Sequence, residues 1–445
     1  MRFIDLFSGL GGFHLALKKL GHECVFASEI NKPIADLYYQ NHGIQPHGDI
    51  RDINIETDIP PHDILCAGFP CQPFSKAGKR LGRKDNTLGT LIDEILFILH
   101  HHKPTYFILE NVPFIAEHDN QSMWKYMKSE FERAGYTSDE KIYSPHEFGI
   151  PQHRQRIYIV GSRKELKHFE WVEPKAEENL SIHKILDKNP QDAKMIEQDE
   201  LDCLDLWQKF IDAIPKNVEI PRFPIWGMEF GATYPIEIDN YPHILSSKEL
   251  GKYKGTFGQS LKGLTKEEQL KLLPSYAKVD KPFPDWKRRY ITQSRNFYNE
   301  YKKELKSVVA EIANLPIASW QKLEWNVGND ERIIKNYIIQ FRASGIRLKK
   351  CNYSPSLVCT NTQIPIIGWE NRYITKTEGA RLQCMEGLKL PENYGTCFKA
   401  LGNAVNVEIV YQIANSLLNE GLANNIVKME VKYKNPLKLI ANGAN

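Results

Sequence analysis

The sequence lacks several features that would by themselves assign a class of protein. Its eight cysteines form no CxxC pair, so their spacing indicates neither a zinc site nor a disulfide framework. No apolar run approaches membrane-spanning length, and the chain starts with the strand-like MRFIDLF rather than with a signal peptide. A GxxxxGK(S/T) loop is missing, so we expect a cofactor without a triphosphate. We therefore expect a cytoplasmic protein with reduced thiols, no metal and no membrane partner.

The sequence also lacks a large excess of either positive or negative charge. The net charge of +3 permits a polyanionic partner but does not argue for one. With 42% hydrophobic and 25% charged residues, the composition is that of an ordinary soluble protein. The length of 445 residues predicts two or three domains, and we find no internal repeat.

What is present begins with a strand, a glycine-rich turn and a helix. Arg2–Phe7 is strand-like, Ser8–Gly12 follows, and Phe13–Leu20 has helical spacing. This order opens a nucleotide-binding βαβ unit, because glycines let the backbone approach a ligand. The spacing is not GxGxxG, so a dinucleotide is not specifically indicated.

Two acids follow at positions that suit an adenosine-type cofactor. Glu29 ends the second strand-like run, 20 residues after Gly9, a spacing at which a carboxylate holds ribose hydroxyls. Asp49 and Ile50 add an acid and an apolar wall for an adenine ring. On spacing alone, a solvated acid at a strand end is an equally good interpretation of Glu29.

The stretch Gly68–Ser75, GFPCQPFS, places a cysteine between two prolines after a short apolar run. Because proline cannot donate to a sheet ladder, the strand is expected to end here. Cys71 then stands on a stiff turn at the carboxyl end of the strand, where open α/β sheets bind ligands. From this stretch alone, a reactive cysteine and a packed, buried thiol are equally good interpretations.

Three further charged features lie downstream. Glu110 ends the apolar strand Tyr106–Leu109 at the same predicted sheet edge. Arg154 and Arg156 share one face of an extended chain, where two guanidiniums bind a carboxylate or phosphate. The basic loop 76–86 contains glycine hinges and would close over a phosphate backbone. Each feature is also compatible with ordinary solvated surface charge.

The regular alternation of strands and helices stops near Ser162 and returns late in the chain. Residues 165 to 350 interleave aromatic and basic residues, which is typical of nucleic-acid binding, although a plain structural insertion stays open. Arg342 and Arg347 are candidate base-reading residues by type only. The expected elements are a helix at Phe297–Ile312, a strand at Pro355–Cys359, a helix from Thr377 and a helix ending near Asn419.

Five motifs together resemble those of the DNA (cytosine-5) methyltransferases of bacterial restriction-modification systems. They are, in order, DLFSGLGGF, GFPCQPFS, ENV, QHRQR and GNAV. The resemblance covers residues 1 to about 165 and about 355 to 418, and the middle matches only in location. It implies an α/β fold with a doubly wound, mostly parallel, Rossmann-like sheet and a second, mixed domain. The expected parts are a catalytic and cofactor-binding domain at 1–165, a target-recognition domain at 166–352, a return segment at 353–420 and a tail at 421–445.

The resemblance also implies roles for individual residues. Cys71 matches the nucleophile, Glu110 the acid on a flipped-out cytosine, and Arg154 and Arg156 the paired arginines of the active site. S-adenosyl-L-methionine is the implied cofactor, with matching residues Phe7, Gly9, Leu10, Gly11, Gly12, Glu29, Ile30, Asp49, Ile50, Pro70, Leu91, Asn403 and Val405. Duplex DNA is the implied partner, and the expected contacts are Gln72, Ser75, Lys76, Lys79, Arg80 and Arg83. A cognate restriction endonuclease in the same system is also implied.

Some residues depart from the family pattern, and three other functions compete with the one that the resemblance implies. Ile30 stands where many relatives have an aromatic residue, and Thr377–Gly387 fits only in part. An RNA cytosine-5 methyltransferase is the main alternative, and the long middle domain argues against it. A non-enzymatic DNA-binding protein would leave the intact Cys71 and Glu110 without a purpose. A nicotinamide dehydrogenase would leave GFPCQPFS unexplained.

Overall fold

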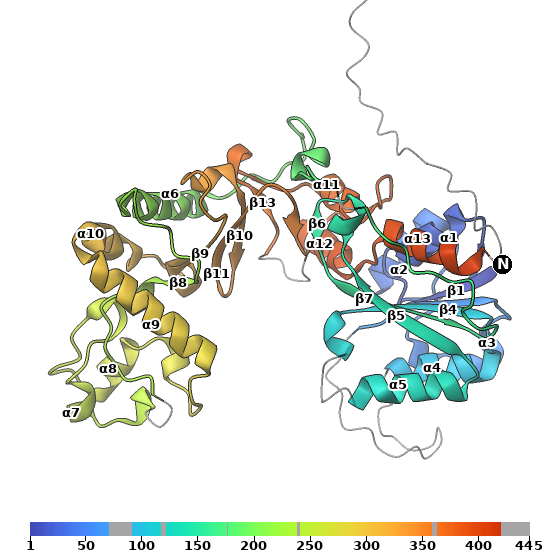
Figure 1. Cartoon of the computed structure of the whole chain (residues 1–445), viewed down its shortest axis with the longest axis horizontal. Helices are drawn as coiled ribbons and strands as arrows, with labels where there is room; N and C mark the ends of the chain where they lie inside the picture. The colour runs from blue at the N-terminus through green and yellow to red at the C-terminus, as the bar shows by residue number, and fades with distance from the viewer. Residues whose placement is uncertain (71–90, 117–121, 176, 238–240, 358–362, 420–445) are drawn as a thin grey trace, which may run out of the picture.

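The computed structural model describes residues 1–70, 91–116, 122–175, 177–237, 241–357 and 363–419. Two lobes lie side by side, each built around its own sheet (Figure 1). None of the described helices is both long and apolar enough to cross a membrane.

The first lobe is built on a six-stranded sheet with the order β2-β1-β3-β4-β7-β5. The first four strands in this order are parallel, and β7 runs antiparallel to both β4 and β5. This arrangement confirms the predicted doubly wound, mostly parallel sheet. The strands are β1 (Arg2–Leu6), β2 (Glu23–Ser28), β3 (Ile64–Gly68), β4 (Tyr106–Asn111), β5 (Thr137–Tyr143) and β7 (Arg156–Ser162).

Helices cover both faces of this sheet (Figure 1). On β3, Ile64 and Cys66 belong to the core on one face, whereas Leu65 and Ala67 belong to the core on the other. Both faces are buried, which explains why the strands read as continuous apolar runs. One core is formed with α1 (Gly12–Lys19), α2 (Lys32–His42) and α13 (Val407–Leu418), and the other with α3 (Ile55–Asp58), α4 (Leu91–His102) and α5 (Ser122–Arg133).

The second lobe has a mixed six-stranded sheet with the order β14-β13-β10-β11-β9-β8. Its strands are β8 (Ile225–Trp226), β9 (Lys322–Asn326), β10 (Ile338–Arg342), β11 (Gly345–Lys349), β13 (Ile366–Ile367) and β14 (Arg372–Tyr373). Its helices are α6 (Gln198–Ala213), α7 (Ser247–Leu250), α8 (Lys266–Lys271), α9 (Asp285–Glu300) and α10 (Lys302–Ile312). The predicted domain boundaries stay a prediction, and this sheet includes two short strands from beyond residue 352.

The chain then returns to the first lobe. Strand β12 (Ser354–Pro355) pairs in parallel with β6 (Gln152–His153), directly before Arg154. Helices α11 (Lys376–Arg381) and α12 (Tyr394–Asn403) follow, and α13 packs against α1. The first lobe is therefore completed by chain that is synthesised after most of the second lobe.

Two expected elements differ from the structure. The single helix expected at Phe297–Ile312 is the end of α9 and the whole of α10, which meet at Tyr301 with non-helical φ −110° and ψ 28°. Apolar spacing continues through this break, so it does not reveal the change of axis. The strand expected at Pro355–Cys359 includes Pro355 in β12, and Cys359 lies outside the described residues.

Candidate functional site

A cavity of about 560 Å³ opens at the carboxyl ends of the central strands of the first sheet. Residues after β1, β2, β3 and β4 line it, together with the end of α12 and the turn before α13. Its size is that of a small-molecule site. The predicted residues in its lining are Phe7, Gly9, Gly12, Glu29, Ile30, Asp49, Ile50, Pro70, Leu91, Glu110, Arg154, Arg156, Asn403 and Val405.

The turn between β1 and α1 forms one wall of this cavity. Phe7 and Gly9 have positive φ angles of 55° and 52°, and a Cβ added to Gly9 would meet no atom within 4 Å. The backbone at Gly9 therefore faces open space, which only a residue without a side chain leaves available to a ligand. Ser8 donates its backbone N–H to Ser28 O at 3.0 Å, while its buried hydroxyl has no hydrogen-bond partner among the described residues.

Two predicted residues of this turn lie behind the cavity wall rather than in it. Leu10 is fully buried in the core, and its carbonyl lies 3.0 Å from His42 Nε2. Gly11 has φ 86°, and a Cβ there would lie 2.3 Å from the same His42 nitrogen. Both residues shape the turn from the inside and contribute no surface to the cavity.

Glu29 is fixed by the backbone on both sides. Its Oε2 accepts the N–H of Gly9 at 3.0 Å, and its Oε1 accepts the N–H of Asn31 at 2.8 Å. The carboxylate therefore links the end of β2 to the glycine turn and keeps lone pairs for further donors. The neighbouring Ile30 lines the cavity with a side chain that is 68% exposed, which places it at the rim.

Asp49 lines the same cavity as Glu29 and caps the short 3-10 helix Ile50–Asp52. Its carboxylate accepts from the Arg51 backbone N–H and from Arg51 Nε, each at 3.0 Å. These bonds hold the pKa of Asp49 below its usual value. Ile50 is buried beside it, so an anionic group and an apolar group face the cavity together.

Glu110 is the most deeply placed acid of the cavity, at 6% exposure. Its Oε1 lies 2.9 Å from Arg156 Nε, yet it accepts no well-aligned hydrogen bond from the described residues. Burial raises the pKa of Glu110, although the guanidiniums of Arg156 and Arg154 act in the opposite direction. A larger share of this carboxyl is therefore protonated near neutral pH than of an ordinary glutamic acid.

The two arginines do different work. Arg156 forms the ion pair with Glu110, whereas the buried Arg154 donates to Ala404 O at 3.0 Å and to Leu357 O at 3.3 Å. Arg154 thus holds the returning chain against the cavity. Their shared orientation toward the cavity agrees with the extended-chain prediction, and the tie of Arg154 to late backbone carbonyls was not visible in the sequence.

Asn111 was missed as a site residue. Its Nδ2 donates to Phe69 O at 2.9 Å, and its Oδ1 accepts the backbone N–H of Val112 at 2.8 Å. These bonds tie the end of β4 to the chain that leads into Pro70. The available signal was its place beside Glu110 in ENV, directly after an apolar strand. Other lining residues not singled out include Ser8, Phe13, Arg51, Thr396 and Lys399.

Several predicted residues cannot be placed. Cys71 and the expected DNA contacts lie outside the described residues, immediately after Pro70; these contacts are Gln72, Ser75, Lys76, Lys79, Arg80 and Arg83. Within the described ranges, no group of three or more His, Cys, Asp or Glu residues has the geometry of a metal site.

Comparisons with known proteins agree on one family. The family model of the C-5 cytosine-specific DNA methylases matches residues 1–223. Type II methyltransferase M.HaeII of Haemophilus aegyptius is 38% identical over 284 residues, 63% of this chain and 84% of the relative. M.HhaI of Haemophilus parahaemolyticus is 39% identical over 220 residues, 49% of this chain and 67% of the relative.

A solved structure shows the same fold. It is that of a candidate DNA modification methyltransferase encoded within an E. coli prophage. The TM-score is 0.52 at 20% identity, and the match covers 94% of this chain and all of the other.

Proposed function

This chain belongs to the C-5 cytosine-specific DNA methylases, and from that premise we propose that Cys71 is its nucleophile and that S-adenosyl-L-methionine is its methyl donor. The enzyme is a DNA (cytosine-5) methyltransferase. The observation that carries the proposal is the convergence of three features on one cavity: the glycine turn with Glu29, the Glu110–Arg156 ion pair, and Pro70, the residue before Cys71.

The residues around the cavity fit this cofactor. Among the residues that the structure describes, no atom lies where a side chain of Gly9 would begin, and the buried Ser8 hydroxyl has no hydrogen-bond partner. Glu29 would accept hydrogen bonds from the ribose hydroxyls, while Asp49 and Ile50 would hold the adenine. The cofactor would supply an electrophilic methyl group to carbon 5 of cytosine.

The protein side chains make that carbon reactive. Carbon 5 of cytosine is a poor nucleophile, and addition of the Cys71 thiolate to C6 forms a C–S bond and pushes an electron pair into the ring. Glu110, whose pKa is raised by burial, would share or donate a proton to N3 and offset the charge. Once carbon 5 has gained the methyl group, its proton leaves to a base such as water, and the electron pair of the broken C–H bond expels the Cys71 thiolate as the C–S bond breaks. N3 returns its proton to Glu110, which restores the neutral aromatic ring.

The substrate follows from the same chemistry. A cytosine in a duplex is unreachable, so the base must leave the stack before Cys71 adds to it. The basic loop after Cys71 is proposed to clamp the phosphates, and the second lobe to read base edges in the major groove. Because its substrate is the cell's own DNA, we place the enzyme in the cytoplasm.

A role in restriction-modification is supported by relatives named as type II methyltransferases, one of them matched over 84% of its length. The enzyme would then protect host DNA from a cognate endonuclease. The RNA-directed alternative is not favoured, because the matching family model describes DNA methylases. Bisulfite sequencing of DNA exposed to the protein would identify the target cytosine.

The proposal is tested by covalent trapping. A target duplex with 5-fluorocytosine at the methylated position should form a stable adduct with the enzyme when S-adenosylmethionine is present, because fluorine cannot leave as a proton does. Cys71→Ala should abolish the adduct on a denaturing gel. Cys66→Ala, at a buried cysteine of β3, is the matched control and should leave it intact. An undiminished adduct in Cys71→Ala would sink the assignment of the nucleophile.

A further inference from the structure

The sheet of the second lobe has one apolar face, and its other face carries charged residues between Trp226 and Ile338, which are buried in other cores. Leu323 and Trp325 on β9, Ile346 and Leu348 on β11, and Phe341 on β10 pack into the core shared with α6 and α10. Side chains alternate along a strand, so the residues between them point to the other side of the sheet. That charged face carries Lys322, Glu324, Gln340, Arg342, Arg347 and Lys349.

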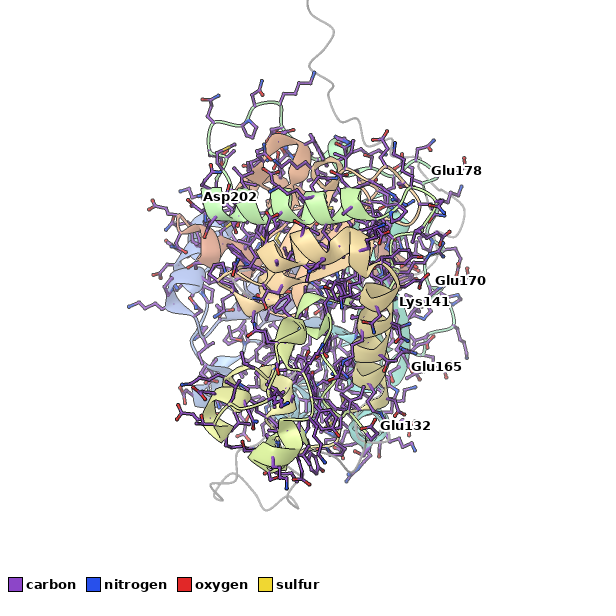
Figure 2. The ribbon with its side chains drawn as sticks, turned by 90° about the vertical axis from the view of Figure 1, so that its left-hand side faces the viewer. Glu132, Lys141, Glu165, Glu170, Glu178 and Asp202 are labelled. Atoms are coloured by element: carbon purple, nitrogen blue, oxygen red, sulfur yellow. The ribbon has the colours of Figure 1, made fainter. Side chains whose placement is uncertain are left out.

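The two sides of this lobe differ in charge. Helix α6, on the apolar side, carries five acids and one lysine, and Figure 2, which looks at the lobe from the side away from the catalytic lobe, shows α6 in front with Asp202. The charged sheet face has four cations against one acid. Figure 1 shows α6 and α10 on the side of this sheet away from the first lobe, so the opposite, charged face is the one on the side of the first lobe. The excess of acids on the outer side belongs to α6 alone, because α10 on the same side carries three lysines and two glutamates. The four cations of the sheet face look inward, which matches a polyanion between the lobes.

Glu324 organises the basic face. Its Oε1 lies 2.5 Å from Arg342 Nη2, and its Oε2 accepts from Arg347 Nε at 2.8 Å. Burial alone would raise the pKa of Glu324, but the two guanidiniums hold it below its usual value, so the carboxylate stays charged. Arg342 is only 10% exposed, whereas one third of the Arg347 side chain is exposed.

Arg347 is thus held at Nε with its outer edge free. Its Nη1 and Nη2 donate to no acceptor in the part of the chain that the structure describes. A guanidinium fixed in this way loses less rotamer freedom on binding than one on a loose side chain. It presents a planar pair of donors, the geometry that matches O6 and N7 of guanine in the major groove.

The face continues into the catalytic lobe. Lys349 Nζ lies 5.1 Å from the centre of the Tyr353 ring, and the Tyr353 and His153 rings stack with centroids 5.8 Å apart. His153 immediately precedes Arg154 of the cavity. A duplex lying on the sheet face would therefore reach the site where the cytosine reacts.

We propose that this charged sheet face docks the major groove of duplex DNA, and that Arg347, positioned by Glu324, reads a guanine of the target sequence. The inference rests on the proposed function and adds to it the surface and a specificity-determining residue. Glu324 acts through Arg347 and is a positioning residue. Lys349 would supply sequence-independent attraction to phosphates, whereas the largely buried Arg342 contributes through its ion pair with Glu324.

The test compares the target duplex with duplexes carrying one substituted base pair, after bisulfite sequencing has identified the target. Arg347→Lys keeps the charge and removes the planar fork. It should reduce discrimination at one G·C pair by about 5- to 150-fold and leave the other positions unchanged. Arg347→Ala should relax the same position, and Glu324→Gln should relax it to a smaller extent. Binding without cofactor, measured by fluorescence anisotropy, should show the same pattern as methylation.

Arg222→Ala is the matched control, because this exposed arginine of the same lobe is ion-paired to Glu219. It should leave the specificity profile unchanged, and urea midpoints should show that every variant is folded. Wild-type selectivity at every position in both Arg347 variants would overturn the inference while leaving the proposed function intact. Failure of the wild-type enzyme to methylate any duplex would instead overturn the proposed function, and this inference with it.

Discussion

At the scale of single residues, the cavity separates two acids that share one sheet edge but face different environments. Glu29 is held by two backbone N–H groups, and Glu110 is buried against Arg156. Burial raises the pKa of Glu110, which suits a proton donor, whereas the two backbone N–H groups fix the orientation of the Glu29 carboxylate. We therefore propose a chemical role for Glu110 and a role in cofactor binding for Glu29.

Substitution should separate these roles. Glu110→Gln should lower the single-turnover rate of methyl transfer by about 100-fold or more, because an amide cannot give up a proton to N3. Its affinity for S-adenosylmethionine, measured by calorimetry, should stay close to that of the wild type. Glu29→Gln should do the reverse and weaken cofactor binding with most of the maximal rate retained. A collapse of cofactor binding in Glu110→Gln would reassign this acid to the other half of the cavity.

The sequence predicted which residues line the cavity better than how they are held. Glu29, Asp49 and Glu110 each follow an apolar run, and a parallel sheet brings such ends to one edge, so their convergence could be anticipated. Leu10 and Gly11 were predicted with them because the motif is contiguous. In the structure, however, these two residues lie on the side of the turn that faces the core rather than the cavity. The bonds of Arg154 to Leu357 and Ala404 join distant parts of the chain and have no local signal.

At the scale of elements, the return segment packs closely against two glycines of the first lobe. A Cβ on Gly12, at the start of α1, would lie 2.5 Å from Val405 O, and one on Gly68, at the end of β3, would lie 2.9 Å from Val405 Cγ2. The start of α1 and the end of β3 therefore both need a residue without a side chain where Val405 closes the cavity. The apolar periodicity of the sequence predicts which faces of these elements are buried, but it does not predict the contact of Val405 with the two glycines.

Two glycine substitutions test the close contact between Gly12 and Val405. Gly12→Ala should lower the free energy of unfolding by about 1–3 kcal/mol, because the contacted atom is backbone and cannot swing away. Gly48→Ala is the control, since it also lines the cavity but would meet no atom within 4 Å. Urea denaturation should show the control within about 0.5 kcal/mol of the wild type. Equal stability of the two variants would contradict the close approach of Val405.

At the scale of the whole molecule, most buried apolar residues of each lobe form cores of their own, although Ile338 of β10 packs into the core of the first lobe. The second core includes Trp207, which is fully buried and donates to Trp320 O at 2.8 Å. Large separate cores favour unfolding in more than one step. The cavity, in contrast, belongs entirely to the first lobe and the chain that returns to it.

Denaturation should show separate transitions for the two lobes, one sensitive to a substitution in the second lobe and the other to the cofactor. Trp207→Ala should destabilise the transition of the second lobe by about 3–5 kcal/mol, whereas Trp286→Ala, at a half-exposed tryptophan of the same lobe, should change it by less than about 0.5 kcal/mol. S-adenosylmethionine at about 100 times its Kd should stabilise the other transition by about 2.7 kcal/mol. A single transition that responds equally to Trp207→Ala and to the cofactor would show that the lobes unfold as one unit.

The close contact between Val405 and Gly12 also determines when, during synthesis of the chain, the cavity can form. Gly12 leaves the ribosome early and Val405 late, separated by roughly 20 to 80 s of translation at about 5–20 residues per second. During that interval the nascent chain already contains Cys71 and Glu110, but the cavity has no closing wall. Growing or prematurely ended chains should therefore be unable to retain the methyl donor, and methylation of the chromosome begins only with chains that have been made through the return segment.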